Sequence, residues 1–209
     1  MFPFDDWWLP DGDTHLMYYI RHQPQYQVVQ RQTSLGHVRR FGVAIDVGAH
    51  IGLWSRELAQ RFAYVHAFEP VAAHADCFER NVVAGNVKLH RMALGRDSGF
   101  VEAEVAAPGN SGTTYVYETN AGVPMRTLDS FEFEDVDFLK IDVEGFELFV
   151  CEGAGLTLAR CRPVVVLEQK TQGPDYFGVP QFAARDFLCG LGAKVLARVR
   201  DDWILGWSE

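Results

Sequence analysis

The chain has 209 residues, 48% of them hydrophobic and 22% charged, which is typical of a globular protein large enough to bury a full core. Its formal net charge of −9 gives no overall attraction to the phosphates of nucleic acids. We expect no membrane span and no signal peptide, because no segment approaches ~18 uninterrupted apolar residues and the first residues lack a basic stretch. The four cysteines show no C-x-x-C spacing, which predicts reduced thiols and a cytoplasmic protein.

Two regions of the chain differ in pattern. Residues 1–40 are irregular and rich in Trp, Tyr, Asp and Gln, which predicts an N-terminal extension with one short helix at 15–22. We expect this extension to pack on a main domain at 41–209, where apolar runs alternate with helical patterns as in an α/β sheet. The first half of the main domain predicts strands at 43–47, 64–68 and 87–91 and helices at 51–62 and 72–84.

The second half of the main domain begins with residues 99–126, which alternate at period two around a Gly-Asn-Ser-Gly turn. This pattern predicts a β-hairpin insertion. The remaining elements are predicted as strands at 136–141, 163–167, 193–199 and 203–207 and helices at 146–158 and 180–191. A tight turn at Asp201-Asp202 makes the last strand antiparallel. We therefore predict a Rossmann-like seven-stranded sheet of the methyltransferase type, mostly parallel, with helices on both faces.

The first β-α-β unit ends each of its strands in an acid, Asp46 and Glu69. Open α/β sheets bind ligands at the carboxyl ends of their strands. A glutamate there suits a ribose, because one carboxylate can accept hydrogen bonds from two vicinal hydroxyls. The turn at 46–52 reads D-x-G-x-x-x-G, whereas a dinucleotide site normally reads G-x-G-x-x-G. A carboxylate in this turn repels a pyrophosphate but suits the ammonium and sulfonium groups of S-adenosylmethionine. The pattern thus favours a methyl-donor site over an NAD site.

Three further acids follow the fourth and fifth predicted strands: Asp142, Glu144 and Glu168. They are the candidate catalytic residues, because two acids two positions apart at a strand end are poorly explained by core packing and a carboxylate can act as a general base. Two structural alternatives stay open, since Glu144 can complement a helix dipole and Glu168 can be an exposed edge charge. Three carboxylates can also hold Mg²⁺, but we expect a carboxylate base and no metal. His15 is a further candidate base if the extension folds over the cleft.

Several segments together resemble the FkbM family of S-adenosylmethionine-dependent methyltransferases. The matching stretches lie at 45–52, 68–70, 92–95, 127–129, 138–147 and 162–168, and Lys140 to Glu147 is the most specific part. His50 departs from the family, which usually has Asn there. The resemblance implies that the loop after the first strand holds the methionine part, that Glu69 holds the ribose, and that Met92 and Ala93 border the adenine. The predicted donor-binding residues are Asp46, Gly48, Ala49, His50, Gly52, Glu69, Pro70, Met92, Ala93 and Asp142.

The same resemblance implies O-methylation of a hydroxyl on a sugar or a small natural product. The main alternative is a methyltransferase that modifies DNA or RNA. Neither the [DNS]-P-P-[YFW] motif of amino-methylating DNA enzymes nor the Pro-Cys nucleophile of cytosine C5 enzymes occurs in the chain. An NAD-linked oxidoreductase and a non-catalytic binding module are the remaining alternatives. The pattern leaves the acceptor and the oligomeric state open.

Overall fold

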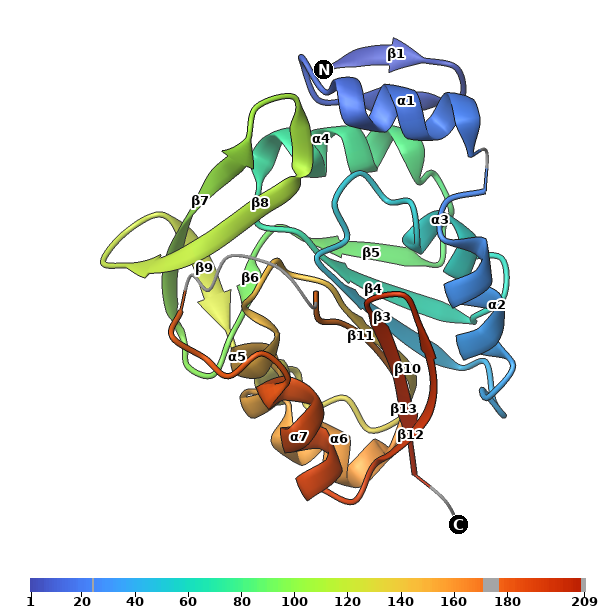
Figure 1. The fold of residues 1–209 in the computed structure, drawn as a ribbon, viewed down its shortest axis with the longest axis vertical. Coiled ribbons are helices and arrows are strands. Elements are labelled where there is room, and N and C mark those ends of the chain that lie inside the picture. Colours follow the sequence, from blue (N-terminus) through green and yellow to red (C-terminus); the bar gives the residue numbers. More distant parts are fainter. Residues whose placement is uncertain (24, 171–176, 208–209) are drawn as a thin grey trace.

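The computed structural model describes residues 1–23, 25–170 and 177–207, and a seven-stranded sheet lies at its centre (Figure 1). The strands run in the order β12-β13-β11-β10-β3-β4-β5. Their bounds are β3 Val43–Val47, β4 Tyr64–Phe68, β5 Val87–His90, β10 Val136–Ile141, β11 Val164–Glu168, β12 Lys194–Val199 and β13 Asp202–Gly206. Strand β13 is antiparallel to both neighbours, and the other pairs are parallel. The predicted fold class is confirmed.

Helices cover both faces of this sheet, because successive side chains of each strand point to opposite faces. Ile45 and Leu139 pack toward one face, which is covered by α5 Glu147–Glu152, α6 Gly155–Cys161 and α7 Ala183–Gly190. Ala44 and Phe138 pack toward the other face, which is covered by α2 Val28–Leu35, α3 Ser55–Leu58 and α4 Ala72–Asn81. Both faces of β3 and β10 are therefore buried, as their near-continuous apolar sequences require.

The N-terminal extension contains more structure than the predicted single helix. Strands β1 Phe2–Phe4 and β2 Trp7–Leu9 form an antiparallel pair, followed by α1 Thr14–His22 and α2. The predicted helix is α1, and the sequence analysis missed α2. The buried face of α2 carries Gln30, Arg31 and Ser34, so the helix shows no apolar stripe in the sequence.

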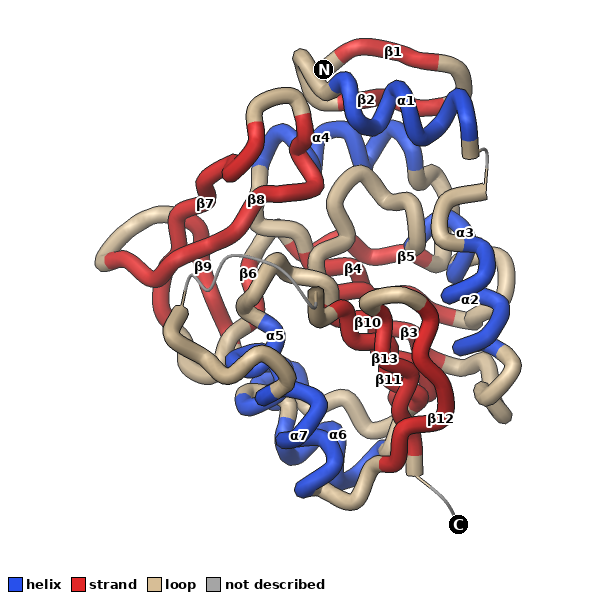
Figure 2. Tube along the Cα trace, viewed as in Figure 1, coloured by secondary structure: helices blue, strands red, loops and turns tan. Residues whose placement is uncertain are grey.

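The predicted hairpin insertion is β7 Gly99–Ala107 with β8 Asn110–Thr119. It belongs to a second sheet of order β6-β9-β7-β8, with β6 Ala93–Leu94 and β9 Val123–Arg126. The hairpin turn contacts the extension, because the main-chain nitrogens of Thr14 and His15 donate to the Gly109 carbonyl at 3.0 and 3.1 Å. Figure 2 shows this turn beside α1. The N-terminal extension and the hairpin turn, which are far apart in the sequence, thus meet beside the carboxyl ends of the main sheet's strands.

Two predicted helices differ from the structure. The helix predicted at 51–62 is regular only over α3, and it begins after Gly52 because that residue is left-handed, with φ +94°. The helix predicted at 146–158 is two helices, α5 and α6. Asp129, in the short 3-10 helix Leu128–Phe131, accepts from the main-chain nitrogens of Leu156 and Thr157 at 2.9 and 2.8 Å and so caps α6.

Within the described ranges, no helix is long and apolar enough to cross a bilayer.

Candidate active site

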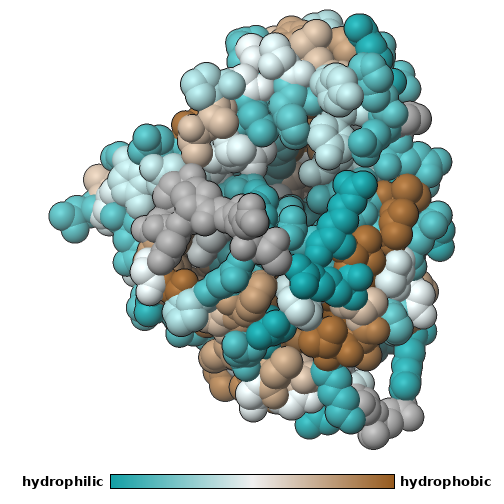
Figure 3. Space-filling view, viewed as in Figure 1, coloured by the Kyte–Doolittle hydropathy of each residue, from teal (hydrophilic) through white to brown (hydrophobic). Residues whose placement is uncertain are grey.

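A cavity of about 560 Å³ opens at the carboxyl ends of β3, β4, β10 and β11. Figure 3 shows a recess on this face of the molecule, and the surface around it is predominantly hydrophilic. Its volume is in the usual range for a small-molecule site. The predicted donor-binding residues that line it are Gly48, Ala49, His50, Glu69, Pro70, Met92, Ala93 and Asp142. Asp46 and Gly52 are not among its lining residues.

The loop after β3 approaches the backbone that follows β10. Gly48 has φ +78°, and a Cβ at this position would lie 1.9 Å from the Asp142 carbonyl oxygen, so the position requires glycine. His50 is also left-handed, with φ +51°. Asn, Asp and His tolerate this conformation better than other side chains. Position 50 of this turn is therefore occupied by a residue that tolerates the left-handed conformation.

Glu69 follows β4 and is only 4% exposed. Its Oε2 accepts from the main-chain nitrogen of His50 at 2.8 Å, and its Oε1 accepts from the nitrogen of Val71 at 2.8 Å. The ring nitrogen Nδ1 of His74 lies 3.4 Å from Oε1. Each carboxylate oxygen can accept more than one hydrogen bond. The side chain is thus fixed in position at the cavity wall and keeps capacity for a ligand hydroxyl.

Asp46 is fully buried beneath the cavity. Its Oδ2 accepts from the Ser55 hydroxyl at 2.7 Å, and its Oδ1 lies 3.6 Å from the Lys140 ammonium. That ammonium also lies 3.2 Å from Asp142. Burial by itself lowers the pKa of Lys140, but attraction by Asp142 and Asp46 outweighs it and raises the pKa above its ordinary value. Sequence analysis gave Lys140 no role, although a charged residue inside an otherwise apolar strand signals a buried ion pair.

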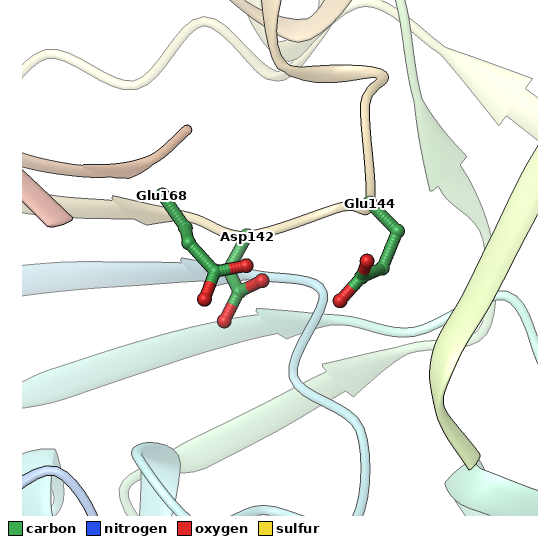
Figure 4. Close-up of side chains that lie close together, drawn as sticks. All are labelled: Asp142, Glu144 and Glu168. Carbon is green, nitrogen blue, oxygen red and sulfur yellow. The ribbon is translucent and has the colours of Figure 1, made fainter. Parts of the chain in front are cut away.

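The three candidate catalytic carboxylates come together. Ligand atoms of Asp142, Glu144 and Glu168 all lie within 4.8 Å of one another. Figure 4 shows the carboxylates of Asp142 and Glu168 side by side, with Glu144 on the loop that follows Asp142. The ammonium of Lys170 lies 2.6 Å from Glu144 and 3.4 Å from Glu168. Oxygen ligands in this arrangement suit a hard divalent cation, but two lysine ammonium groups already lie against the cluster.

Asp142 and Glu168 have opposite pKa shifts. Burial and the negative charge of Asp142 raise the pKa of Glu168 well above its ordinary value. Burial also acts to raise the pKa of Asp142, but attraction by Lys140 and a hydrogen bond with Glu168 lower it overall. The two groups titrate as a pair, in which Glu168 holds the proton more tightly and Asp142 stays ionised.

The capping alternative for Glu144 does not describe its contacts, because its carboxylate lies against Lys170. Glu147, the first residue of α5, instead contacts the loop that precedes the helix. Its Oε1 accepts from the main-chain nitrogens of Gly145 and Val143 at 2.9 and 3.2 Å. The edge-charge alternative for Glu168 does not fit either, because its side chain is only 16% exposed and lines the cavity.

The outer wall of the cavity comes from the extension and the hairpin turn. His15, Tyr19 and Tyr26 line it together with side chains from β8. The neutral polar residues of this wall are Gln23, Gln25, Gln27, Gln30, Asn110, Ser111, Thr113 and Thr114. His15 therefore lies where the sequence analysis required it for a role at the cleft. The sequence analysis noted that the extension is rich in glutamine but gave these side chains no role, because glutamines at 23–30 are equally typical of a solvated surface.

The strand order, the single antiparallel strand and the position of the cavity define the α/β fold of S-adenosylmethionine-dependent methyltransferases. The model of the methyltransferase FkbM domain family matches residues 46–195. The chain therefore belongs to the FkbM family and is an S-adenosylmethionine-dependent methyltransferase.

Solved structures agree with this fold. Methyltransferase FkbM from Methylobacillus flagellatus KT is 16% identical with a TM-score of 0.57, covering 81% of this chain and 45% of that one. The chain thus spans less than half the length of that protein. Precorrin-6y C5,15-methyltransferase from Geobacter metallireducens is 18% identical with a TM-score of 0.52, covering 88% and 89%. An rRNA methylase from Streptococcus thermophilus is 11% identical with a TM-score of 0.52, covering 85% and 92%. No curated protein matches the chain.

Proposed function

We propose that this protein methylates a hydroxyl group of a neutral sugar or a small natural product. The observation that carries the proposal is the composition of the cavity. A partly buried carboxylate pair, Asp142 and Glu168, lies at its inner wall, and neutral hydrogen-bonding side chains form its outer wall. The first feature suits removal of a hydroxyl proton, and the second suits recognition of a polyhydroxylated molecule.

The inner part of the cavity fits the methyl donor. S-adenosylmethionine supplies an electrophilic methyl group on a sulfonium. Glu69 would accept from the two ribose hydroxyls, and Gly48 to His50 would hold the methionine part. Met92 and Ala93, which line the same cavity, would border the adenine. Asp142 would orient the amino-acid end or act on the acceptor. Asp46 would act from below, by holding Lys140 in place beside Asp142.

An aliphatic hydroxyl is a weak nucleophile, so a base must accept its proton. The Asp142–Glu168 pair supplies carboxylate oxygens at the cavity wall for this role. A base is most effective when its pKa lies near the working pH, and the raised pKa of Glu168 moves the pair in that direction. Lys140 keeps Asp142 ionised, so the pair can receive the proton of the acceptor once Glu168 has lost its own.

The charge of the cavity favours a neutral acceptor over a nucleic acid. Among the described lining residues there are six carboxylates (Glu69, Asp142, Glu144, Glu168, Asp201 and Asp202) and three cationic side chains (Lys140, Lys170 and Arg200). A phosphate backbone is repelled by such a surface and by the net charge of −9.

The four cysteines are free, which supports a reducing compartment such as the cytoplasm.

The test is an acceptor screen with donor labelled in the methyl group. The panel holds neutral saccharides, polyhydroxylated small molecules, structured RNA and duplex DNA, and Asp142→Asn is the control that separates enzymatic from background transfer. Labelled methyl ethers on neutral hydroxyl compounds, absent with the control variant, are the expected result. Transfer to RNA or DNA alone would overturn the proposal in favour of a nucleic-acid substrate.

A further inference from the structure

A chain of hydrogen bonds joins the loop after β3 to both segments that cover the cavity. The ring nitrogen Nε2 of His50 lies 2.7 Å from the Ser111 hydroxyl at the start of β8. That hydroxyl donates a very short hydrogen bond to Oδ2 of Asp13, which also accepts from the Ser111 main-chain nitrogen at 2.9 Å. Asp13 precedes α1 and caps it, through Oδ1 and the nitrogen of Leu16 at 2.7 Å. Asp13 is 2% exposed and Ser111 is 9% exposed.

The chemistry of these groups determines the direction of each hydrogen bond. An ionised carboxylate only accepts, so the single hydroxyl proton of Ser111 points to Asp13. The Ser111 oxygen must then accept from His50, which places the imidazole proton on Nε2. Nδ1 is left with a lone pair and can only accept a hydrogen bond. Asp13 thus determines the tautomer of His50 through Ser111.

The surroundings of His50 keep its ring neutral. Burial and the neighbouring His74 lower the pKa of His50 well below its ordinary value. The rings of His50 and His74 meet edge to face with centroids 4.3 Å apart, and Nδ1 of His74 lies 3.4 Å from Glu69. Among the hydrogen bonds of the described residues, none involves Nδ1 of His50. The His50 ring therefore lies in the wall of the donor cavity with one acceptor nitrogen that no described side chain satisfies.

We propose that Asp13 and Ser111 are positioning residues that orient His50 so that its Nδ1 accepts a hydrogen bond from an N–H or O–H group of the methyl donor. Donor binding then depends on the contact between the N-terminal extension and the hairpin turn. Neither segment belongs to the central sheet. This inference rests on the donor position given under the proposed function. It assigns a role to two residues that the sequence patterns left without one, and a specific contact to the histidine that replaces the family's usual asparagine.

The tautomer is tested on the ligand-free protein by ¹⁵N NMR of histidine side chains, with His50→Asn used to identify the His50 signals. The expected spectrum shows a neutral ring protonated on Nε2. The spectrum of Ser111→Ala should change, with Nδ1–H appearing, whereas Thr119→Ala should leave it unchanged. Thr119 is the matched control, because its hydroxyl lies on the same strand and bonds within its own turn. A ring protonated on Nδ1 in the unmodified protein would overturn the inference.

Donor binding is tested by calorimetry with S-adenosylhomocysteine. Ser111→Ala and Asp13→Asn should each raise Kd about tenfold, because one hydrogen bond to the donor is lost or misdirected. Asn retains the cap on α1 while placing an amide proton against Ser111. Ser111→Thr keeps the hydroxyl and should restore affinity, and Thr119→Ala should bind normally. A double-mutant cycle completes the test: in the His50→Asn background, Ser111→Ala should change Kd less than twofold.

The outcomes separate this inference from the proposed function. If the unmodified protein does not bind S-adenosylhomocysteine, the donor position itself is wrong. If the unmodified protein binds and Ser111→Ala binds equally well, the positioning role alone is overturned. Urea unfolding of Ser111→Ala identifies a purely structural contact, which would lower stability, leave Kd unchanged and likewise overturn the inference.

Discussion

The ammonium of Lys140 lies 3.2 Å from the carboxylate of Asp142, and the two residues are two positions apart at the end of β10. Alternate residues of a strand share a face, so the backbone itself brings this pair together. The same ammonium lies 3.6 Å from Asp46 on the neighbouring strand. One buried lysine thus links Asp46, which lies beneath the cavity, to Asp142 in the cavity wall.

Removing this lysine should destabilise the protein. Lys140→Met would leave Asp46, which is fully buried, without its cationic partner, and loss of one partner of a buried ion pair costs about 3–5 kcal/mol. Urea unfolding measures the change, with Lys88→Met as a control at an exposed lysine. Adding Asp46→Asn to Lys140→Met should recover part of the loss. Equal stability of Lys140→Met and the unmodified protein would contradict the role assigned to the ion pair.

The carboxylate pair should determine the pH dependence of turnover. A base must be ionised to act, and the pKa of Glu168 is raised, so activity should rise with pH through the apparent pKa of the pair and then level off. In Glu168→Gln the rise should move to lower pH, because the pKa of Asp142 is lowered by Lys140. A pH profile identical to that of the unmodified protein would remove Glu168 from the reaction.

Asp142→Asn should damage the enzyme more than Glu144→Gln. If Asp142 is the base, turnover should fall about 10²–10⁴-fold while donor affinity holds. If it acts mainly on the donor, the donor Kd should rise about tenfold. Glu144→Gln should cost stability through the loss of its ion pair with Lys170 and should leave most of the rate. An Asp142→Asn protein with normal donor affinity and normal turnover would show that the active site lies elsewhere.

Turnover should survive exhaustive treatment with EDTA, because Lys140 and Lys170 already neutralise part of the acidic cluster. The measurement compares the rate before and after chelation and after addition of Mg²⁺. Loss of activity that Mg²⁺ restores would show instead that Asp142, Glu144 and Glu168 hold a cation.

Glu69→Gln should weaken binding of S-adenosylhomocysteine by about 2 kcal/mol, or roughly thirtyfold in Kd, because charge-assisted hydrogen bonds to the ribose are lost. The matched control is Glu79→Gln on α4, an exposed acid that pairs with Arg91. Calorimetry on both variants gives the comparison. Unchanged affinity in Glu69→Gln would remove this residue from the donor site.

Glu147 should make stability fall between about pH 4.5 and pH 7. Burial raises the pKa of this carboxyl from 4.5 to about 7 in the folded protein, so folding favours the protonated form. The resulting stabilisation is complete below pH 4.5 and is lost as pH rises through 7, a change of about 3 kcal/mol. In Glu147→Gln this part of the pH dependence should disappear. Parallel stability curves for the two proteins over this range would contradict the assignment.

The elements that carry the candidate catalytic carboxylates can be identified from the amino-acid sequence alone. Strands β3, β4 and β10 have the predicted bounds, because strands of a parallel sheet are buried on both faces and appear as continuous apolar runs. Asp142 directly follows the run that forms β10, and Glu168 ends the run that forms β11. Since the carboxyl ends of neighbouring parallel strands meet at one edge of a sheet, the sequence also predicts that these two acids lie close together.

Which polar side chains of distant segments meet around the cavity depends instead on the tertiary structure. The hydrogen bonds from Ser111 to Asp13 join residues 98 positions apart, and they exist because the hairpin turn packs on α1. The buried face of α2 is polar, so no periodic pattern identifies it. The spacing of apolar residues in a short stretch of sequence predicts whether a helix or strand is buried. Polar contacts between distant segments depend on how those segments pack, and no local pattern of residues predicts that packing.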